Sequence, residues 1–272
     1  MSGELLETKM VEKVWGRDIL PAPFDAPDGK TIGEIWFHSP PALEALLAKY
    51  LFTSEKLSVQ VHPDDARAPA GARGKDECWL VLDAEPGAKL AIGFDEEQSP
   101  ETVREAAKDG SIEELLTWHD VEPGDFFYLP AGTVHAIGGG LSICELQRNS
   151  EITYRLYDYG RPRELHLDEA MAVASLEPYP DHLRQRVNSG ESCNLVDGPY
   201  FRVDLVTGSS LDADLAAISG ATMVLPLEGC AAIGDMEVPG GAAGWTDTIS
   251  DLRLDSSDAR VLLFSKLKSS TR

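Results

Sequence analysis

The strongest fold signal in this chain of 272 residues is the stretch GDFFYLPAGTVH, residues 124–135. Asp125 to Leu129 predicts a short strand, because aromatic and aliphatic residues favour strands and a Pro-Gly pair precedes them. Gly132 lies where a tight turn requires a residue with positive φ. His135 then begins a returning strand, so the stretch predicts a hairpin-like unit that ends on a histidine.

Strand patterns recur on both sides of this stretch. Residues 57–62 alternate apolar and polar side chains, which is typical of a half-buried strand. Further strands are expected at 77–82, 141–146, 153–157, 200–206, 221–227 and 259–266. Many short strands divided by Gly and Pro turns predict an all-β dominated fold, either a sandwich or a small barrel of the jelly-roll type.

Short helical insertions are expected among the strands. One is predicted near 40–51, where Ser39 and Pro40 look like a helix start, and a second region covers 99–117. In that second region Ser99 begins a helix, Gly110 ends it, and Ser111 begins a capping box. A further short helix is expected at 167–174.

The periodicity breaks near 176–190, which divides the chain into a larger domain at 1–178 and a smaller C-terminal β-domain at 190–272. Residues 190–272 contain no histidine, so this domain is a poor candidate for a metal site and is expected to be structural.

Charge and composition exclude several kinds of partner. The formal net charge of −22 argues against nucleic acid and against anionic membrane surfaces, although a few local cations can still hold a small phosphorylated molecule. No apolar run is long enough for a transmembrane helix, and the first ten residues lack the pattern of a secretory signal. The four cysteines are widely spaced and are expected to be reduced thiols in a cytoplasmic protein. A monomer is the default expectation for its oligomeric state.

Four residues form a candidate metal site. Gln60 and His62 are two apart on a predicted strand, so their side chains share one face. Glu77 begins a strand that is otherwise apolar, and a buried carboxylate requires a partner such as a cation. With His135, these residues would supply two imidazole nitrogens, one carboxylate and one amide oxygen. That set suits a catalytic zinc ion with an open coordination position, although Mn²⁺, Co²⁺ or Fe²⁺ would also fit.

The residues from 124 to 135 match G-x5-P-x-G-x2-H, the second sequence motif of the cupin superfamily. A closer resemblance extends over roughly the first 175 residues. The segments at 11–20, 32–40, 57–65, 74–94 and 124–161 resemble the short bacterial form of type I mannose-6-phosphate isomerase. The chain departs from the family at Arg17, where the family often has glycine. The resemblance implies a cupin barrel, with the smaller domain a degenerate cupin-like unit.

The resemblance also implies roles for individual residues. It makes Gln60, His62, Glu77 and His135 ligands of one zinc ion, and it places Lys75, Glu145 and Arg155 in the active site. Glu34 and Lys56 match positions that the family associates with the site less firmly. The implied reaction is the interconversion of mannose 6-phosphate and fructose 6-phosphate through an enediol intermediate.

This reaction moves a proton between C1 and C2 of the open-chain sugar, so it needs a base and a group that stabilises negative charge. Glu145 is the first candidate for the base, and Lys75 or a metal-bound hydroxide are the alternatives. Arg155 could stabilise the enediolate or hold the phosphate. A basic cluster of Arg148, Arg161 and Arg163 could also bind phosphate, or could be ordinary solvated loop charge.

Two other functions remain open at this stage. Two histidines and one carboxylate also suit an iron-dependent cupin dioxygenase, but such enzymes usually carry a His-x-His pair where this chain has Gln60-Val61-His62. A sugar-binding cupin with a structural metal and no catalysis is the second alternative, and it would not exchange the C2 proton of a bound sugar with solvent.

Overall fold

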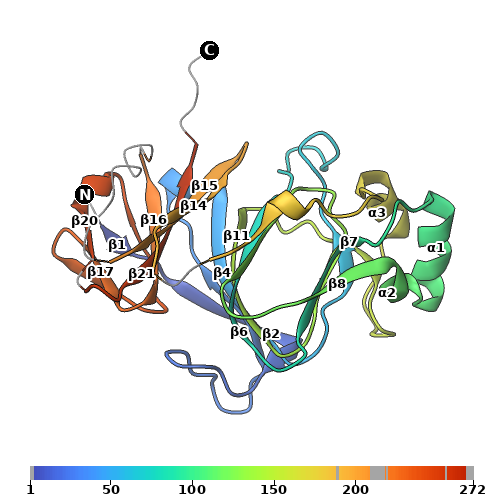
Figure 1. Cartoon of the computed structure of the whole chain (residues 1–272), viewed down its shortest axis with the longest axis horizontal. Helices are drawn as coiled ribbons and strands as arrows, with labels where there is room; N and C mark the ends of the chain where they lie inside the picture. Colours follow the sequence, from blue (N-terminus) through green and yellow to red (C-terminus); the bar gives the residue numbers. More distant parts are fainter. Residues whose placement is uncertain (1–2, 188–189, 209–217, 219, 255, 268–272) are drawn as a thin grey trace.

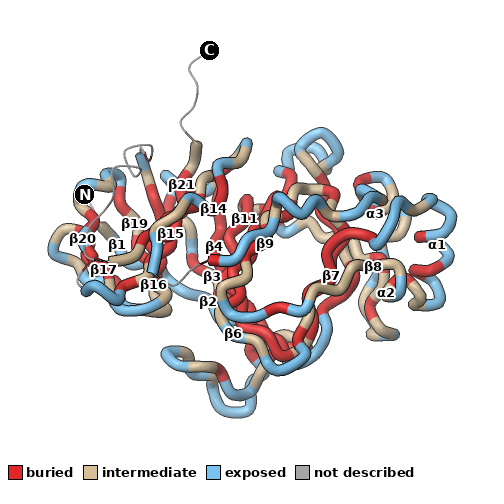
Figure 2. The backbone as a smooth tube through the Cα atoms, viewed as in Figure 1, coloured by how far each residue is buried: buried red, intermediate tan, exposed pale blue. Residues whose placement is uncertain are grey.

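The computed structural model describes residues 3–187, 190–208, 218, 220–254 and 256–267. Its main elements form layers along the long axis of the molecule, in the order helices, five-stranded sheet, seven-stranded sheet and six-stranded sheet (Figure 1). Buried backbone follows the strands of the inner layers, whereas the outer loops and helices are largely exposed (Figure 2). In the described part of the chain, no helix is both long enough and apolar enough to cross a bilayer.

The five-stranded sheet has the order β12-β5-β10-β7-β8, and all its neighbours are antiparallel. Its strands are β5 (Val59–Val61), β7 (Lys89–Phe94), β8 (Leu116–Asp120), β10 (His135–Ile137) and β12 (Tyr154–Tyr157). Strand β5 is central to the site because it pairs with β10 on one side and β12 on the other. Gln60 is consequently opposite His135 on one neighbour and Arg155 on the other.

The seven-stranded sheet has the order β13-β9-β6-β11-β4-β3-β2. Its strands are β2 (Thr8–Arg17), β3 (Ile32–Phe37), β4 (Leu46–Thr53), β6 (Glu77–Ala84), β9 (Asp125–Leu129), β11 (Leu141–Arg148) and β13 (Arg184–Arg186). Between this sheet and the five-stranded sheet lies an apolar cluster that includes Leu51, Val81, Ile92 and Ile143. The two sheets face one another as in a jelly roll, so the predicted fold class is confirmed.

The helices cover the outer face of the five-stranded sheet. They are α1 (Pro100–Asp109), α2 (Ile112–Leu115) and α3 (Leu167–Val173). Single 3₁₀ turns form elsewhere in the described chain, at Pro41–Leu43, Asp181–Leu183 and Ile249–Asp251. The Ser99 hydroxyl accepts a hydrogen bond from the amide of Thr102, and Gly110 ends α1 with φ of 91°, as predicted. The capping box predicted at Ser111 is wrong: its hydroxyl donates instead to the Asp109 carboxylate.

The helix predicted near 40–51 is also wrong. Only one 3₁₀ turn forms there, and residues 46–53 form strand β4. Every residue of β4 is buried, because the sheet is covered on both faces. A strand buried on both faces is apolar at nearly every position, and such a run cannot be distinguished from a buried helix by its periodicity.

The remaining strands lie beyond the seven-stranded sheet. The six-stranded sheet, of order β1-β19-β16-β21-β15-β14, contains β1 (Glu4–Leu5), β14 (Cys193–Asp197), β15 (Phe201–Thr207), β16 (Thr222–Glu228), β19 (Gly244–Thr246) and β21 (Arg260–Lys266). A small sheet contains β17 (Cys230–Ile233), β18 (Met236–Pro239) and β20 (Leu252–Leu254). One apolar cluster, including Tyr50, Cys144, Val203 and Phe264, joins the six-stranded and seven-stranded sheets.

The division into domains at 1–178 and 190–272 stays a prediction. Strands of residues 190–272 make up most of the six-stranded sheet, in agreement with a separate β-unit. One short strand nevertheless crosses the proposed division, since β1 pairs with β19, and β13, in the segment between the two proposed domains, pairs with β9.

Candidate metal centre and active-site cleft

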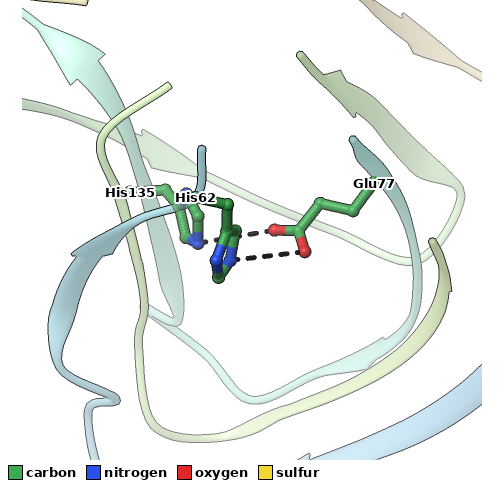
Figure 3. Close-up of side chains that lie close together, drawn as sticks. All are labelled: His62, Glu77 and His135. Carbon is green, nitrogen blue, oxygen red and sulfur yellow. Dashed lines mark ion pairs between the residues drawn. The ribbon is translucent and has the colours of Figure 1, made fainter. Parts of the chain in front are cut away.

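His62, Glu77 and His135 converge between the two facing sheets. His62 immediately follows β5, Glu77 begins β6, and His135 begins β10, so each of the three comes from a different strand. Their ligand atoms lie within 4.8 Å of one another, and all three residues are buried. Nε2 of His62 is 3.6 Å from Oε2 of Glu77, and Nε2 of His135 is 3.4 Å from Oε1 (Figure 3).

Backbone carbonyl groups fix the orientation of both imidazole rings. The Nδ1 atom of His62 is 2.7 Å from the carbonyl oxygen of Ile152, and that of His135 is 2.9 Å from the carbonyl oxygen of Thr133. A carbonyl oxygen only accepts hydrogen bonds, so each Nδ1 carries the proton and each Nε2 presents a lone pair to the centre. This is the arrangement in which histidine binds a metal ion.

Burial keeps both histidines neutral. It lowers the pKa of His62 well below its usual value, and the nearby Lys75 ammonium lowers it further. Burial also lowers the pKa of His135, although the Glu77 carboxylate opposes this effect. Two neutral imidazoles therefore direct lone pairs at a carboxylate, an arrangement that a cation at the centre would stabilise.

Lys75 provides one positive charge beside this cluster. Its Nζ atom lies 2.5 Å from Oε2 of Glu77 and 3.0 Å from Nε2 of His62. Burial is the largest single effect and raises the pKa of Glu77, but Lys75, His135 and Lys49 together outweigh it and the pKa is lowered. Oε1 of Glu77 is buried and has no hydrogen-bond partner among the described residues, and that oxygen is the one nearer to His135. This oxygen and the two Nε2 lone pairs, which here face the Lys75 ammonium and the Gln60 amide, fit a bound divalent cation.

Gln60 lies beside the cluster, and its amide nitrogen, rather than its amide oxygen, faces His135. Its Nε2 is 3.3 Å from Nε2 of His135, and its Oε1 accepts a hydrogen bond from the Ser58 hydroxyl. The predicted role as an oxygen ligand requires the amide to turn over. Ser58 can accept as well as donate, so the turned amide would keep a hydrogen-bond partner there.

A cleft of about 100 Å³ adjoins the cluster and is lined in part by Gln60 and Lys75. Glu145 lines it from β11, and the carboxylate is held from two sides. Oε1 accepts a hydrogen bond of 3.1 Å from the Trp79 indole, and Oε2 is 3.2 Å from the ammonium of Lys49. The strand register explains this grouping, because Glu145 is directly opposite Trp79 on β6 and Lys49 on β4.

Arg155 lines the same cleft from β12. Its Nε atom is buried, and none of the described residues forms a hydrogen bond with it. Burial and nearby Arg163 lower the pKa of Arg155 below its ordinary value. Arg163 differs in that both its Nε and one Nη atom donate to the Asp158 carboxylate. Arg155 is therefore the cleft arginine that keeps donors available for a ligand.

The other residues considered from the sequence lie in different places. Glu34 lines the cleft and accepts a hydrogen bond of 2.6 Å from Trp36. Lys56 pairs with Glu113 and lies over the ring of Trp118.

The predicted basic cluster of three arginines divides into two groups. Arg161 and Arg163 share Asp158, whereas Arg148 pairs with Asp65 and Asp76. Each of these arginines thus has an acidic partner.

Sequence reasoning missed Lys49 and Lys13, which also line the cleft. Lys49 is the single charged residue in the apolar run of β4, and a buried lysine within a strand is a signal for a paired carboxylate. The helix predicted at 40–51 prevented this inference, because a residue on a helix is not paired with a residue on a neighbouring strand. Lys13 lies on the edge strand β2 and is 3.5 Å from Glu34.

Comparisons with known proteins agree with this site. No family model matches the chain. A curated mannose-6-phosphate isomerase from Streptococcus mutans is 40% identical over 182 residues, which cover 62% of this chain and 57% of the relative. The crystal structure of the mannose 6-phosphate isomerase from Bacillus subtilis has a TM-score of 0.77 at 26% identity and covers 97% of this chain and 99% of that one. The chain is similar in sequence and in fold to mannose-6-phosphate isomerases.

The resemblance to type I mannose-6-phosphate isomerases noted in the sequence is thereby confirmed. The chain spans about three fifths of the length of the curated mannose-6-phosphate isomerases it matches, between 57% and 61%. A zinc-bound mannose 6-phosphate isomerase structure has a TM-score of 0.72 at 16% identity over 98% of this chain and 100% of that one, and so shares the fold.

Proposed function

We propose that the protein is a metal-dependent aldose–ketose isomerase that interconverts mannose 6-phosphate and fructose 6-phosphate through an enediol intermediate. The observation that carries the proposal is the buried set of His62, Glu77 and His135, with both Nε2 lone pairs directed at the centre and a cationic cleft beside it. Homology to mannose-6-phosphate isomerases supports the choice of substrate.

Zinc is the cofactor we propose, one ion per chain, held by His62, Glu77, His135 and Gln60. The two nitrogens and the carboxylate suit zinc, and Gln60 would complete the set through its amide oxygen. When bound, zinc supplies Lewis-acid stabilisation of the negative charge that develops on the sugar oxygens. Proton transfer and binding of the substrate's negative charge would then be carried out by side chains of the cleft.

Two side chains are our candidates for moving the proton between C1 and C2. Glu145 is the first candidate, because Trp79 and Lys49 fix its carboxylate beside the cleft. Lys75 is the second, because its ammonium already lies among the metal ligands, where a divalent cation would favour its neutral, basic form. Substituting each residue separately distinguishes the two assignments.

Arg155 has the task of holding negative charge on the substrate. Its planar fork remains charged and can donate two parallel hydrogen bonds to a phosphate or an enediolate. The lack of a hydrogen-bond partner for its Nε among the described residues supports this role. Lys13 and Lys49 add positive charge to the same cleft, although each is already close to a carboxylate.

We also propose a cytoplasmic location for the enzyme. All four cysteines are free thiols, and the two most buried, Cys78 and Cys144, have their pKa raised by burial. Reduced cysteines agree with a reducing compartment.

The test is a coupled assay for conversion of mannose 6-phosphate to fructose 6-phosphate. It should use protein as purified, protein treated with a chelator, and chelated protein restored with zinc. Activity that is lost with the chelator and returns with zinc supports both substrate and cofactor. Folded, zinc-loaded protein without turnover would overturn the assigned reaction. Exchange of the C2 proton without net conversion would instead point to an enediol that is reprotonated at C2, and so to an epimerase rather than an aldose–ketose isomerase.

A further inference from the structure

Arg148 occupies a buried position on the face of β11 opposite Glu145. Residues three apart on a strand point to opposite faces, so Arg148 is directed away from the cleft. Only 7% of its surface is exposed. One Nη atom is 2.6 Å from Oδ1 of Asp65, and the other is 3.8 Å from Oδ2 of Asp76. The Arg148 amide also donates to the carbonyl oxygen of Asp76.

The two aspartates bracket the segment that separates the metal-ligand candidates. Residues 63–76 connect His62 to Glu77. Asp65 lies near the beginning of this segment, and Asp76 is its last residue. The ends of this segment are joined: the amide of Gly74 donates to Oδ1 of Asp65, and the amide of residue 75 donates to the carbonyl of residue 63. Arg148 thus ties both ends of one closed loop to β11.

Tyr200 covers the exposed side of this guanidinium. Its ring centre lies 3.8 Å from Cζ of Arg148, which is a stacking distance for a planar cation on an aromatic face. Tyr200 immediately precedes β15 and therefore comes from the C-terminal part of the chain. Tyr128 contacts the aspartate that pairs with this guanidinium, because its hydroxyl donates a hydrogen bond to Oδ1 of Asp76.

These contacts connect the C-terminal sheet to the metal-ligand candidates without any C-terminal residue entering the cleft. Oδ2 of Asp76 and one Nη of Arg148 are buried without a short hydrogen bond among the described residues, and the Tyr200 ring covers the guanidinium beside this long ion pair. Without the ring, water would reach the guanidinium, weaken its attraction to both aspartates and release the loop.

We propose that Tyr200 is a positioning residue for the metal centre: by stacking on Arg148 it holds segment 63–76 closed and so fixes the separation of His62 and Glu77. This inference rests on the metal site of the proposed function. It gives the C-terminal sheet a role beyond structural support, since part of the geometry of the metal ligands would be set by a residue outside the catalytic domain.

The test measures zinc affinity by competition with a chromophoric chelator, using the full chain. Tyr200→Phe keeps the ring, Tyr200→Leu keeps apolar volume without an aromatic face, and Val203→Ala is a matched control that weakens the same core. Substitution of groups that orient metal ligands lowers affinity by about 10- to 100-fold. Because Tyr200 acts through Arg148, we expect the lower end, about tenfold, for Tyr200→Leu and less than about twofold for Tyr200→Phe and Val203→Ala.

Hydrogen exchange provides the second readout. Amides of segment 63–76 should exchange faster in Tyr200→Leu than in Val203→Ala, even if the two variants are equally destabilised. Unchanged zinc affinity and unchanged exchange in folded Tyr200→Leu would overturn the proposal, as would equal losses in Val203→Ala. If the wild-type chain binds no zinc, the metal site itself fails. If it binds zinc without isomerase activity, the reaction fails while the role of Tyr200 is still tested by affinity.

Discussion

The ammonium of Lys75 lies 2.5 Å from the carboxylate of Glu77, and both side chains are more than nine-tenths buried. The two residues are separated by one position at the beginning of β6, so they project from the same face. A charge of each sign is thus placed beside the two histidines before any ligand binds.

Replacement of Lys75 by methionine should destabilise the chelator-treated protein, because it leaves the Glu77 carboxylate buried without a cation. Breaking a buried pair in this way costs about 3–5 kcal/mol of unfolding free energy. The loss should be smaller in zinc-saturated protein, where the ion would replace the missing charge. Urea denaturation with chelator and with zinc measures both values. Equal losses in the two conditions would contradict the assignment of Glu77 as a ligand.

Replacement of His135 by alanine should weaken zinc binding by at least about 100-fold and abolish turnover, since it removes one of the nitrogen ligands. His182→Ala is the matched control, because His182 is exposed and lies outside the cluster. Calorimetric titration with zinc provides the affinities. A His182 variant as impaired as the His135 variant would show that the cluster is not the binding site.

Replacement of Glu145 by glutamine should lower kcat by about 10²- to 10⁴-fold if Glu145 transfers the proton, whereas zinc affinity should be nearly unchanged. The amide keeps the size of the side chain and can still accept from Trp79, but Lys49 loses its charged partner, so kinetics should be measured on variant protein shown to be folded. Steady-state kinetics together with zinc titration separate the two effects. A variant with wild-type kcat would transfer the proton role to Lys75.

Replacement of Arg155 by lysine should raise KM for the sugar phosphate by about tenfold or more, because a lysine cannot provide the paired donors of the guanidinium. The comparison is Arg163→Lys, in which the replaced group is already bound to Asp158. We expect a smaller effect on KM for that variant. An unchanged KM with Arg155→Lys would argue against a substrate contact through the guanidinium.

The chelated protein should lose stability as the pH falls below about 6.5, the ordinary pKa of histidine. Burial lowers the pKa of both His62 and His135, so the unfolded chain binds more protons than the folded chain in that range. Stability is therefore present above pH 6.5 and decreases at lower pH. Denaturation midpoints at pH 7.5 and 5.5 should differ less for a His62→Gln, His135→Gln double variant. An equal difference in that variant would assign the pH dependence to other groups.

The sequence predicted the strands that are bounded by turns, because Pro and Gly mark their ends. The strand at Asp125–Leu129 has the predicted bounds, and the positive φ expected at Gly132 is present at 93°. The histidines and Glu77 could be predicted because their residue types are unusual on apolar strands. Strand β4 could not, because its burial on both faces depends on sheets formed by residues far away in the sequence.

Partners of the charged side chains were harder to predict than the strands. The ion-pair partner of the Glu145 carboxylate is Lys49, almost 100 residues away, and not one of the nearby arginines Arg148 and Arg155. The pairing follows from the register of β4 against β11, and a single sequence contains no information on register between distant strands. For the same reason, Arg148 could not be separated from Arg161 and Arg163.

Strand β11 is covered on both sides, with Glu145 directed toward the cleft and Cys144 toward the C-terminal core. The number of residues in β11 is consequently constrained. One residue inserted within β11 would exchange the surroundings of these neighbours, placing a thiol beside the proposed zinc ligands and a carboxylate among leucines. Among relatives of this chain, insertions and deletions should therefore collect in the exposed connections, such as residues 18–31, while β4, β6 and β11 keep constant length.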